Sequence, residues 1–187
     1  MCKLTVNPSQ FEAPWRRVTT GYVTATASVP AGLTHNPSAW RERLLLAVIA
    51  AAGAVISAYL ACYQLKLIDT VYDPIFGPSS SHAVLFSSFS KSLPVPDALL
   101  GTLNYLAEIV LDLVGGDDRW RTRPVIVLLF GLLLAVGALV SIGLILMQAL
   151  VVGHFCTLCL ISAGLSILLA LLGSREVRAA WGTYRER

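Results

Sequence analysis

The apolar positions of this chain fall into long runs that charged and turn-forming residues separate. Two runs, Leu44 to about Leu67 and Pro124 to about Val152, are long enough to cross roughly 30 Å of hydrocarbon as helices of about 20 residues. Two shorter runs cover residues 98–114 and 156–173. The pattern therefore predicts an all-α integral membrane protein, a bundle of four transmembrane helices.

The run at residues 98–114 has the weakest pattern of the four. Glu108 and Asp112 interrupt it, and ionisable groups inside a bilayer are costly. Turn sequences nevertheless bound it on both sides, because Pro94-Val95-Pro96-Asp97 precedes it and supplies an N-cap, and Gly115-Gly116 follows it. We therefore count this run as a span.

Composition and charge agree with a membrane domain. Hydrophobic residues make up 56% of the chain and charged residues 13%, and the mean hydropathy is +0.70. Four spans place all but two of the 14 Lys and Arg residues, Lys66 and Lys91, on one side of the bilayer. By the positive-inside rule that side is cytoplasmic and holds both termini. We expect a bacterial inner membrane protein that lies in the lipid bilayer and binds no nucleic acid.

The predicted organisation is a single membrane domain between two tails. Residues 1–43 form a cytoplasmic tail without the apolar region of a signal peptide, residues 44–173 form the bundle, and residues 174–187 form a second cytoplasmic tail. The external loop, residues 68–97, is rich in Ser, Pro and Gly. Within it, residues 79–92 mix apolar residues with serines and predict a short helix lying over the bundle mouth as a lid.

A Cys-x-x-Cys pair, Cys156 and Cys159, opens the last apolar run. This spacing puts the two sulfurs within disulfide reach, and the start of a helix favours the thiolate over the thiol. The topology places the pair on the external side, where disulfides persist. Half of a zinc site has the same spacing, but zinc normally takes four ligands and no second such pair or paired His stands nearby, so we expect no metal.

Four features in order along the chain resemble the vitamin K epoxide reductase family. They are Tyr72-Asp73-Pro74-Ile75-Phe76-Gly77, then Ser80-Ser81-His82-Ala83-Val84-Leu85-Phe86-Ser87-Ser88, then Pro94-Val95-Pro96-Asp97-Ala98-Leu99-Leu100-Gly101, and last the dithiol. The resemblance runs from about Arg43 to Ser174. It implies a four-helix membrane thiol oxidoreductase that works with a quinone such as ubiquinone, menaquinone or a relative.

The resemblance also implies roles for particular residues. Cys159, which helical spacing points into the bundle near Ser166, would exchange electrons with the quinone, and Cys156, nearer the mouth, would exchange with an incoming thiol. The quinone would lie against Asp97, Tyr105, Ser162 and Ala163. Asp73, Phe76, Ser80 and Ser81 would belong to the loop lid.

The chain departs from the family at the second cysteine pair, which the family carries in the external loop. Tyr72 occupies the place of the first loop cysteine, and Ser80 or Ser81 that of the second. The tyrosine that follows the dithiol in the family is also missing, with Ala163 near its position. Electrons would therefore come from a separate thioredoxin-like protein acting in trans.

Two classes of function remain open. One is the thiol:quinone oxidoreductase. The other is a non-enzymatic membrane module that keeps the scaffold and uses the dithiol for metal or haem-related thiol binding, or as a static disulfide.

Several single residues also have two interpretations. Cys62, near the external end of the first span, is either a small core residue or a substitute relay to Cys156. His154 is either interfacial or a stabiliser of the neighbouring thiolate. Glu108 has either a proton-pathway role or a structural one, whereas structural pairing or cytoplasmic snorkelling is favoured for Asp112.

Overall fold

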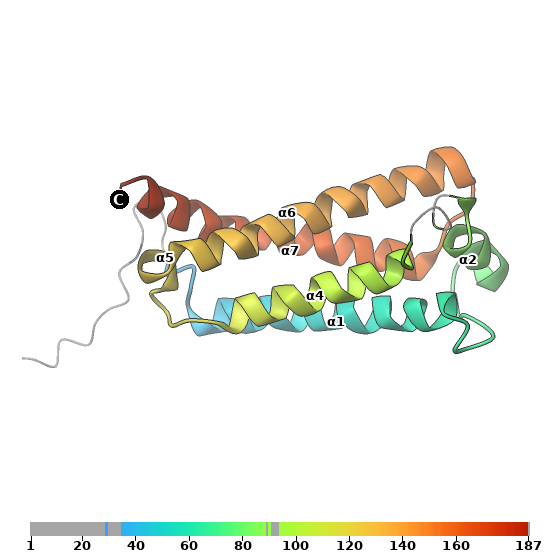
Figure 1. Ribbon diagram of the computed structural model, residues 1–187, viewed down its shortest axis with the longest axis horizontal. Helices are drawn as coiled ribbons and strands as arrows, with labels where there is room; N and C mark the ends of the chain where they lie inside the picture. Colours follow the sequence, from blue (N-terminus) through green and yellow to red (C-terminus); the bar gives the residue numbers. More distant parts are fainter. Residues whose placement is uncertain (1–28, 30–34, 89, 91–93, 187) are drawn as a thin grey trace, which may run out of the picture.

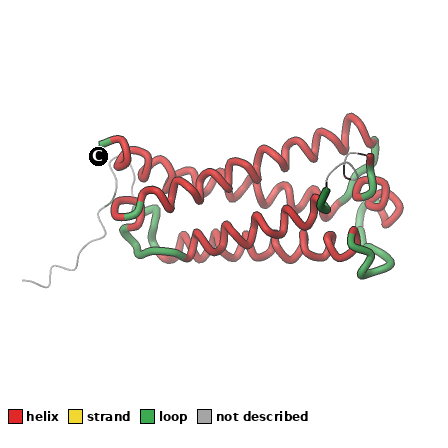
Figure 2. The backbone as a smooth tube through the Cα atoms, in the orientation of Figure 1, coloured by secondary structure: helices red, strands yellow, loops and turns green. Residues whose placement is uncertain are grey.

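Helices make up most of the part of the chain that the computed structural model describes, which comprises residues 29, 35–88, 90 and 94–186 (Figure 1). No strand occurs in these residues (Figure 2). The main helices in chain order are α1 (Trp40–Gln64), α2 (Gly77–Leu85), α4 (Asp97–Leu113), α5 (Arg119–Thr122), α6 (Pro124–Met147), the π-helical turn η3 (Gln148–Val152) and α7 (Thr157–Arg185).

The four long helices pack around a common axis. Contacts join α1 to α4, α4 to α6, α6 to α7 and α7 to α1, so each helix has two neighbours. The short helix α2 lies over one end of the bundle and α5 at the other (Figure 1). The end with α2 also holds the start of α7 with its cysteines, and we call it the dithiol end. The end with α5 is the opposite end.

Three helices are long and apolar enough to cross a membrane: α1, α6 with η3 (Pro124–Val152), and α7. Large apolar side chains on their outer surfaces, among them Val55 at 70% exposed and Leu139 at 69%, support contact with lipid. These helices fit a multi-pass membrane protein.

The helix α4 has 17 residues and runs antiparallel to α1. Gln64 at the end of α1 donates to the carboxylate of Asp97 at the start of α4, and Arg43 near the start of α1 donates to the Asp112 carbonyl near the end of α4. At 1.5 Å per residue α4 is about 26 Å long. Whether α4 crosses the membrane as the fourth span stays a prediction.

Two helix ends differ from those that the apolar pattern predicts. The first helix ends at Gln64, before Leu67, and the last continues to Arg185, beyond Gly173. Hydropathy marks where a helix leaves lipid, whereas the backbone continues through good helix formers such as the Arg, Glu and Ala residues after Gly173. The predicted lid helix begins at Gly77 and ends at Leu85, and part of the predicted range after it lies outside the described residues.

Small residues bring α1 and α4 close together. Ala50, Gly53, Ala54 and Ser57 are buried on α1, as close helix approach in a membrane requires. A Cβ on Gly53 would collide with the ring of Tyr105. This tyrosine therefore lies flat against the backbone of α1, with its hydroxyl directed toward α7.

Buried charges join the helices at the opposite end. Arg119 donates from Nε and Nη2 to the two carboxylate oxygens of Glu176, both at 2.6 Å, and from Nη2 to Asp112 at 3.1 Å. Arg43 is also buried and donates to backbone carbonyls of residues 112 and 115. Asp112 therefore has the structural pairing that the sequence favours for it.

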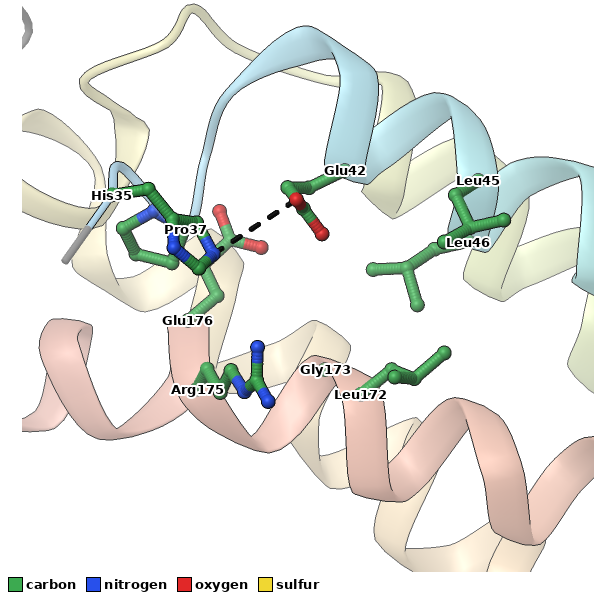
Figure 3. A pocket seen from close by; sticks show the side chains of 9 residues that line it. All are labelled: His35, Pro37, Glu42, Leu45, Leu46, Leu172, Gly173, Arg175 and Glu176. Carbon is green, nitrogen blue, oxygen red and sulfur yellow. Dashed lines mark ion pairs between the residues drawn. The ribbon is translucent and has the colours of Figure 1, made fainter. Parts of the chain in front are cut away.

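A small cavity of about 30 Å³ lies beside these charges (Figure 3). Side chains of α1 and α7 face each other across it, and His35 and Glu42 approach to 3.9 Å at its rim. Its volume holds about one water molecule. It is too small to bind an organic substrate.

Candidate dithiol site and cavity

Cys156 and Cys159 form a disulfide at the start of α7. Their Cα atoms are 5.2 Å apart, within the normal range for a disulfide. Cys156 is the N-cap of α7, and its sulfur accepts a hydrogen bond from the Cys159 N–H at 3.2 Å. The predicted disulfide reach of the pair is confirmed.

The two sulfurs have different surroundings. Cys156 is 0% exposed and packs in an apolar cluster with Leu60, Val71 and Leu85. Cys159 is partly buried and lies on the wall of a large cavity. The external loop contributes Val71 and α2 contributes Leu85 to the cluster that covers Cys156.

Asp73 fastens the loop to the start of α7. Its carboxylate accepts hydrogen bonds from the N–H and hydroxyl of Thr157, at 2.8 and 2.5 Å, and from the Ser81 hydroxyl at 2.5 Å. The Ile75 and Phe76 N–H groups donate to it as well. Thr157 is the first residue of α7, so a negative charge stands where the helix dipole stabilises it.

These contacts decide the charge state of Asp73, which is 7% exposed. Burial alone would raise its pKa, but the hydrogen bonds from Ser81, Thr157 and Phe76 outweigh burial and hold the pKa well below its usual range. Asp73 is therefore a carboxylate at neutral pH. We call Asp73, Ser81 and Thr157 the clasp.

Ser80 and Ser81, the two candidates for the second loop-cysteine place, have separate contacts. Ser81 belongs to the clasp, whereas the Ser80 hydroxyl donates to the Phe155 carbonyl at 2.7 Å and accepts from the Phe155 N–H at 3.2 Å. The Phe76 ring lies 5.4 Å from the Phe155 ring. Tyr72 is exposed, and its N–H donates to the Tyr59 hydroxyl. The Ser80 contacts therefore hold α2 against the residue that precedes Cys156.

A cavity of about 870 Å³ adjoins the dithiol within the bundle. Apolar side chains of α4, α6 and α7 form most of its wall, and two residues of this wall, Leu100 and Val140, are exposed. Such a size and such a lining are typical of sites for small organic ligands. The cavity therefore has room for a flat ring.

The structure brings the predicted quinone-binding residues together on this cavity. Its lining includes Cys159 together with Asp97, Tyr105, Ser162 and Ala163. The Tyr105 hydroxyl donates to the Ser162 carbonyl at 2.6 Å, and the hydroxyls of Ser162 and Ser57 are 3.0 Å apart. That these residues bind a quinone stays a prediction.

Two glutamines of the site escaped the sequence analysis. The buried Gln148 accepts from the Cys156 N–H through Oε1 at 3.0 Å, and Gln64 donates to Ser90 and to Asp97. Gln148 does carry a signal in the sequence, because it is a polar residue inside a long apolar run. A buried polar side chain needs a partner, and here the partner is the dithiol backbone.

Cys62 and His154, which the sequence analysis singled out, are not part of this set of contacts around the dithiol. Cys62 is a free, half-buried thiol that is not among the residues packed around Cys156. Its relay role stays a prediction. His154 is exposed beside the dithiol.

Fold and site together define a multi-pass helical membrane protein whose disulfide lies between a polar loop clasp and a large apolar cavity. Residues 44–173 match the family model described as the vitamin K epoxide reductase family, and the chain belongs to this family. Members of the family are generally membrane oxidoreductases that act on thiols and use a quinone as substrate.

Proposed function

We propose that this protein is a membrane thiol:quinone oxidoreductase that supports disulfide formation. Electrons enter the dithiol from the thiols of a separate thioredoxin-like protein and leave from Cys159 to a quinone in the cavity. The observation that carries this proposal is that Cys159, half of a disulfide, lies on the wall of an 870 Å³ apolar cavity. We place the dithiol on the external face of a bacterial inner membrane.

The proposed cycle has two balanced halves. A donor thiolate attacks the sulfur of Cys156, and Cys159 leaves as a thiolate. The second thiol of the donor then attacks the bond between the donor and Cys156, so that the donor leaves as a disulfide and Cys156 as a thiol. The reduced pair then gives two electrons and two protons to the quinone, so that two O–H bonds form while the Cys156–Cys159 bond closes. Because Cys156 is fully buried, the clasp must open in the first half.

The cavity wall offers a way to hold the ring during the second half. Ala163 leaves space beside Cys159, and the hydroxyls of Tyr105 and Ser162 supply hydrogen-bonding groups on the same wall. Asp97 lies toward the dithiol end, where Gln64 and Ser90 hold its carboxylate. Leu100 and Val140 line the cavity and are exposed, which favours entry of the quinone from the bilayer.

The first test is a stoichiometric assay in detergent. The reduced protein is mixed with ubiquinone or menaquinone, and quinone reduction and free thiols are followed together. We expect one quinone reduced for each Cys156–Cys159 pair oxidised, and no reaction in Cys159→Ser. Thiols that persist beside unreduced quinone would remove the proposal.

In the same assay, driven by a thioredoxin-like donor, Cys62→Ser loses turnover only if Cys62 is a relay.

A second candidate is a static disulfide in a non-enzymatic module, and the complete burial of Cys156 favours it. Its distinguishing property is resistance to reduction: a static disulfide stays closed when the folded protein is treated with excess dithiothreitol, whereas a redox site opens. For the metal-binding form of this candidate, no three His, Cys, Asp or Glu side chains converge within the described residues. Metal analysis of the purified protein tests that form directly.

A further inference from the structure

A buried acid lies directly behind the deep wall of the large cavity. Glu108 on α4 is 1% exposed, and its Oε1 accepts from the Asn104 amide at 2.6 Å. Its Oε2 has no hydrogen-bond partner in the described part of the chain. Asp112, one turn further along α4, is different because it pairs with Arg119. Glu108 is therefore an acid that the structural charge network does not use.

Three polar groups meet where Glu108 approaches the cavity. A Cβ placed on Gly137 would lie 2.8 Å from the Asn104 amide nitrogen, 2.9 Å from the Ser166 hydroxyl and 3.3 Å from Glu108 Oε1. Asn104, Gly137 and Ser166 all line the cavity. The missing side chain at Gly137 thus lets a serine hydroxyl and the buried acid converge on one point of the wall.

Hydroxyl groups connect this point with the dithiol. Ser162 lies one helical turn after Cys159 on α7, and Ser166 one turn after Ser162, so the three share a face. The Tyr105 hydroxyl lies 3.4 Å from the Ser162 hydroxyl. We call Ser162, Tyr105 and Ser166 the hydroxyl strip, which follows the cavity wall from Cys159 toward Glu108.

The reduction of a quinone requires a proton at each of its two carbonyl oxygens, and the groups at the deep wall lie where one of these protons is needed. The two carbonyl oxygens of a para-quinone point in opposite directions, so one faces the dithiol when the other faces the deep wall. The near oxygen can take its proton from the dithiol, but the far oxygen cannot reach it. The far oxygen needs a second acid, and Asn104, Ser166 and Glu108 stand on that side.

We propose that Glu108 supplies, through the Ser166 hydroxyl, the proton that the far oxygen of the quinone takes up. This inference rests on the proposed function. The dithiol loses two electrons and two protons as its S–S bond forms, and the quinone gains two electrons and two protons as a quinol. One thiol proton goes to the near oxygen. The other travels along the hydroxyl strip and restores the acid form of Glu108, so the step needs no further reactant.

The surroundings of Glu108 favour its acid form at rest. A buried carboxylate without a cation is costly, and the neutral acid avoids this cost. The charged groups nearest along the bundle are Asp112 on α4, Arg119 on α5, Arg43 on α1 and Glu176 on α7. They are bonded to one another or to backbone carbonyls at the opposite end, and α6 carries no charged residue. Glu108 is thus poised to give a proton to a base that enters the cavity.

The test compares two substitutions, Glu108→Gln and Glu108→Asp. A packing role and a proton-donor role predict opposite orders for their rates of quinone reduction. Glu108→Gln keeps the shape and can still accept from Asn104, but has no acid proton. Glu108→Asp keeps the acid on a shorter side chain. The reduced proteins are mixed with a short-chain ubiquinone in single-turnover experiments. We expect Glu108→Gln to slow quinone reduction by about 100-fold at unchanged quinone affinity, and Glu108→Asp to be faster than Glu108→Gln.

Glu186→Gln, at an exposed position after α7, is the matched control for loss of a carboxyl and retains the wild-type rate. A Glu108→Gln protein as fast as the wild type, with Glu108→Asp slower, would make Glu108 a packing residue and overturn this inference alone. A wild-type protein that does not reduce quinone would overturn the proposed function and this inference with it. Retention of the Cys156–Cys159 disulfide in each oxidised variant shows that the site has folded.

Discussion

At the scale of single residues, access to the disulfide depends on Asp73, which fastens the external loop to the dithiol helix. The Asp73 carboxylate accepts from the N–H and the hydroxyl of Thr157, the first residue of that helix. The clasp therefore stabilises the closed loop and keeps external thiols from Cys156. Access to the disulfide and stability of the clasp are linked, because the same hydrogen bonds control both.

Asp73→Asn tests this link. The substitution replaces one acceptor oxygen by a donor and leaves N–H and O–H groups of the clasp without partners, which costs about 1–3 kcal/mol. We expect dithiothreitol to reduce the Cys156–Cys159 disulfide faster in this variant at pH 7. Asp69→Asn, at an exposed position of the same loop, is the control and keeps the wild-type rate. Equal rates in all three proteins would show that the clasp does not limit access.

The pH dependence of the clasp follows from the lowered pKa of Asp73. A carboxyl whose pKa is lower in the folded state than its unfolded value of about 3.9 adds stability at higher pH and loses it as the pH falls toward the folded value. The clasp is thus at full strength at neutral pH and weakens only in acid below about pH 4. The dithiothreitol accessibility of the wild type should stay constant from pH 6 to pH 8 once the thiolate fraction of the reagent is taken into account.

At the scale of helices, the contact of α1 with α4 positions Tyr105 on the cavity wall. Gly53→Ala places a methyl group in the Tyr105 ring and forces the ring to move. Such overpacking typically costs about 1–3 kcal/mol. We expect a lower midpoint of thermal unfolding in detergent and weaker quinone binding, measured by titration. Gly164→Ala on α7 is the matched control, because a Cβ there meets nothing within 4 Å. A Gly53→Ala protein as stable as this control would contradict the packing described here.

The apolar pattern predicts the long helices well because burial in lipid is a property of each helix alone. It locates α6 with η3 from Pro124 to Val152 and places the cysteines at the start of α7. It misses the end of α7 at Arg185, because a helix that leaves the membrane is no longer constrained by hydropathy. It also misses the clasp and the role of Gln64, since these depend on contacts between residues far apart in the chain, and the role of Gln148, which accepts from the Cys156 N–H beyond its own helix.

The site residues, like the helices, divide into features that the spacing along one helix predicts and features that depend on contacts between segments. Spacing along one helix places Cys159, Ser162 and Ser166 on a common face, and the cavity lining includes all three. The burial of Cys156 does not follow from spacing, because α2 and the segment before it provide the cover. The distinction between Glu108 and Asp112 likewise depends on Arg119, which comes from another helix.

At the scale of the whole molecule, the placement of the dithiol depends on whether α4 crosses the membrane. The hydrogen bonds of Gln64 and Arg43 align α4 with α1 over most of the bilayer thickness. If α4 crosses, the loop at Asp69 and the turn at Gly116 lie on opposite sides of the membrane. If it does not, both lie on the same side, because only α4 would separate them.

Single cysteines at these two exposed positions decide the topology. Asp69→Cys and Gly116→Cys are each introduced into a protein whose Cys2 and Cys62 are replaced by serine, and intact bacterial cells with a permeabilised outer membrane are treated with a membrane-impermeant maleimide. We expect Asp69→Cys to react in intact cells and Gly116→Cys only after the inner membrane is lysed, because the positive-inside rule puts the Arg-rich turn in the cytoplasm. The cysteine-replaced protein without an added cysteine is the control for reaction at the dithiol. Reaction of both cysteines in intact cells would mean that α4 lies on one side of the bilayer. Reaction of Gly116→Cys alone would place the dithiol in the cytoplasm. Glutathione keeps thiols reduced there, and disulfide formation is not supported.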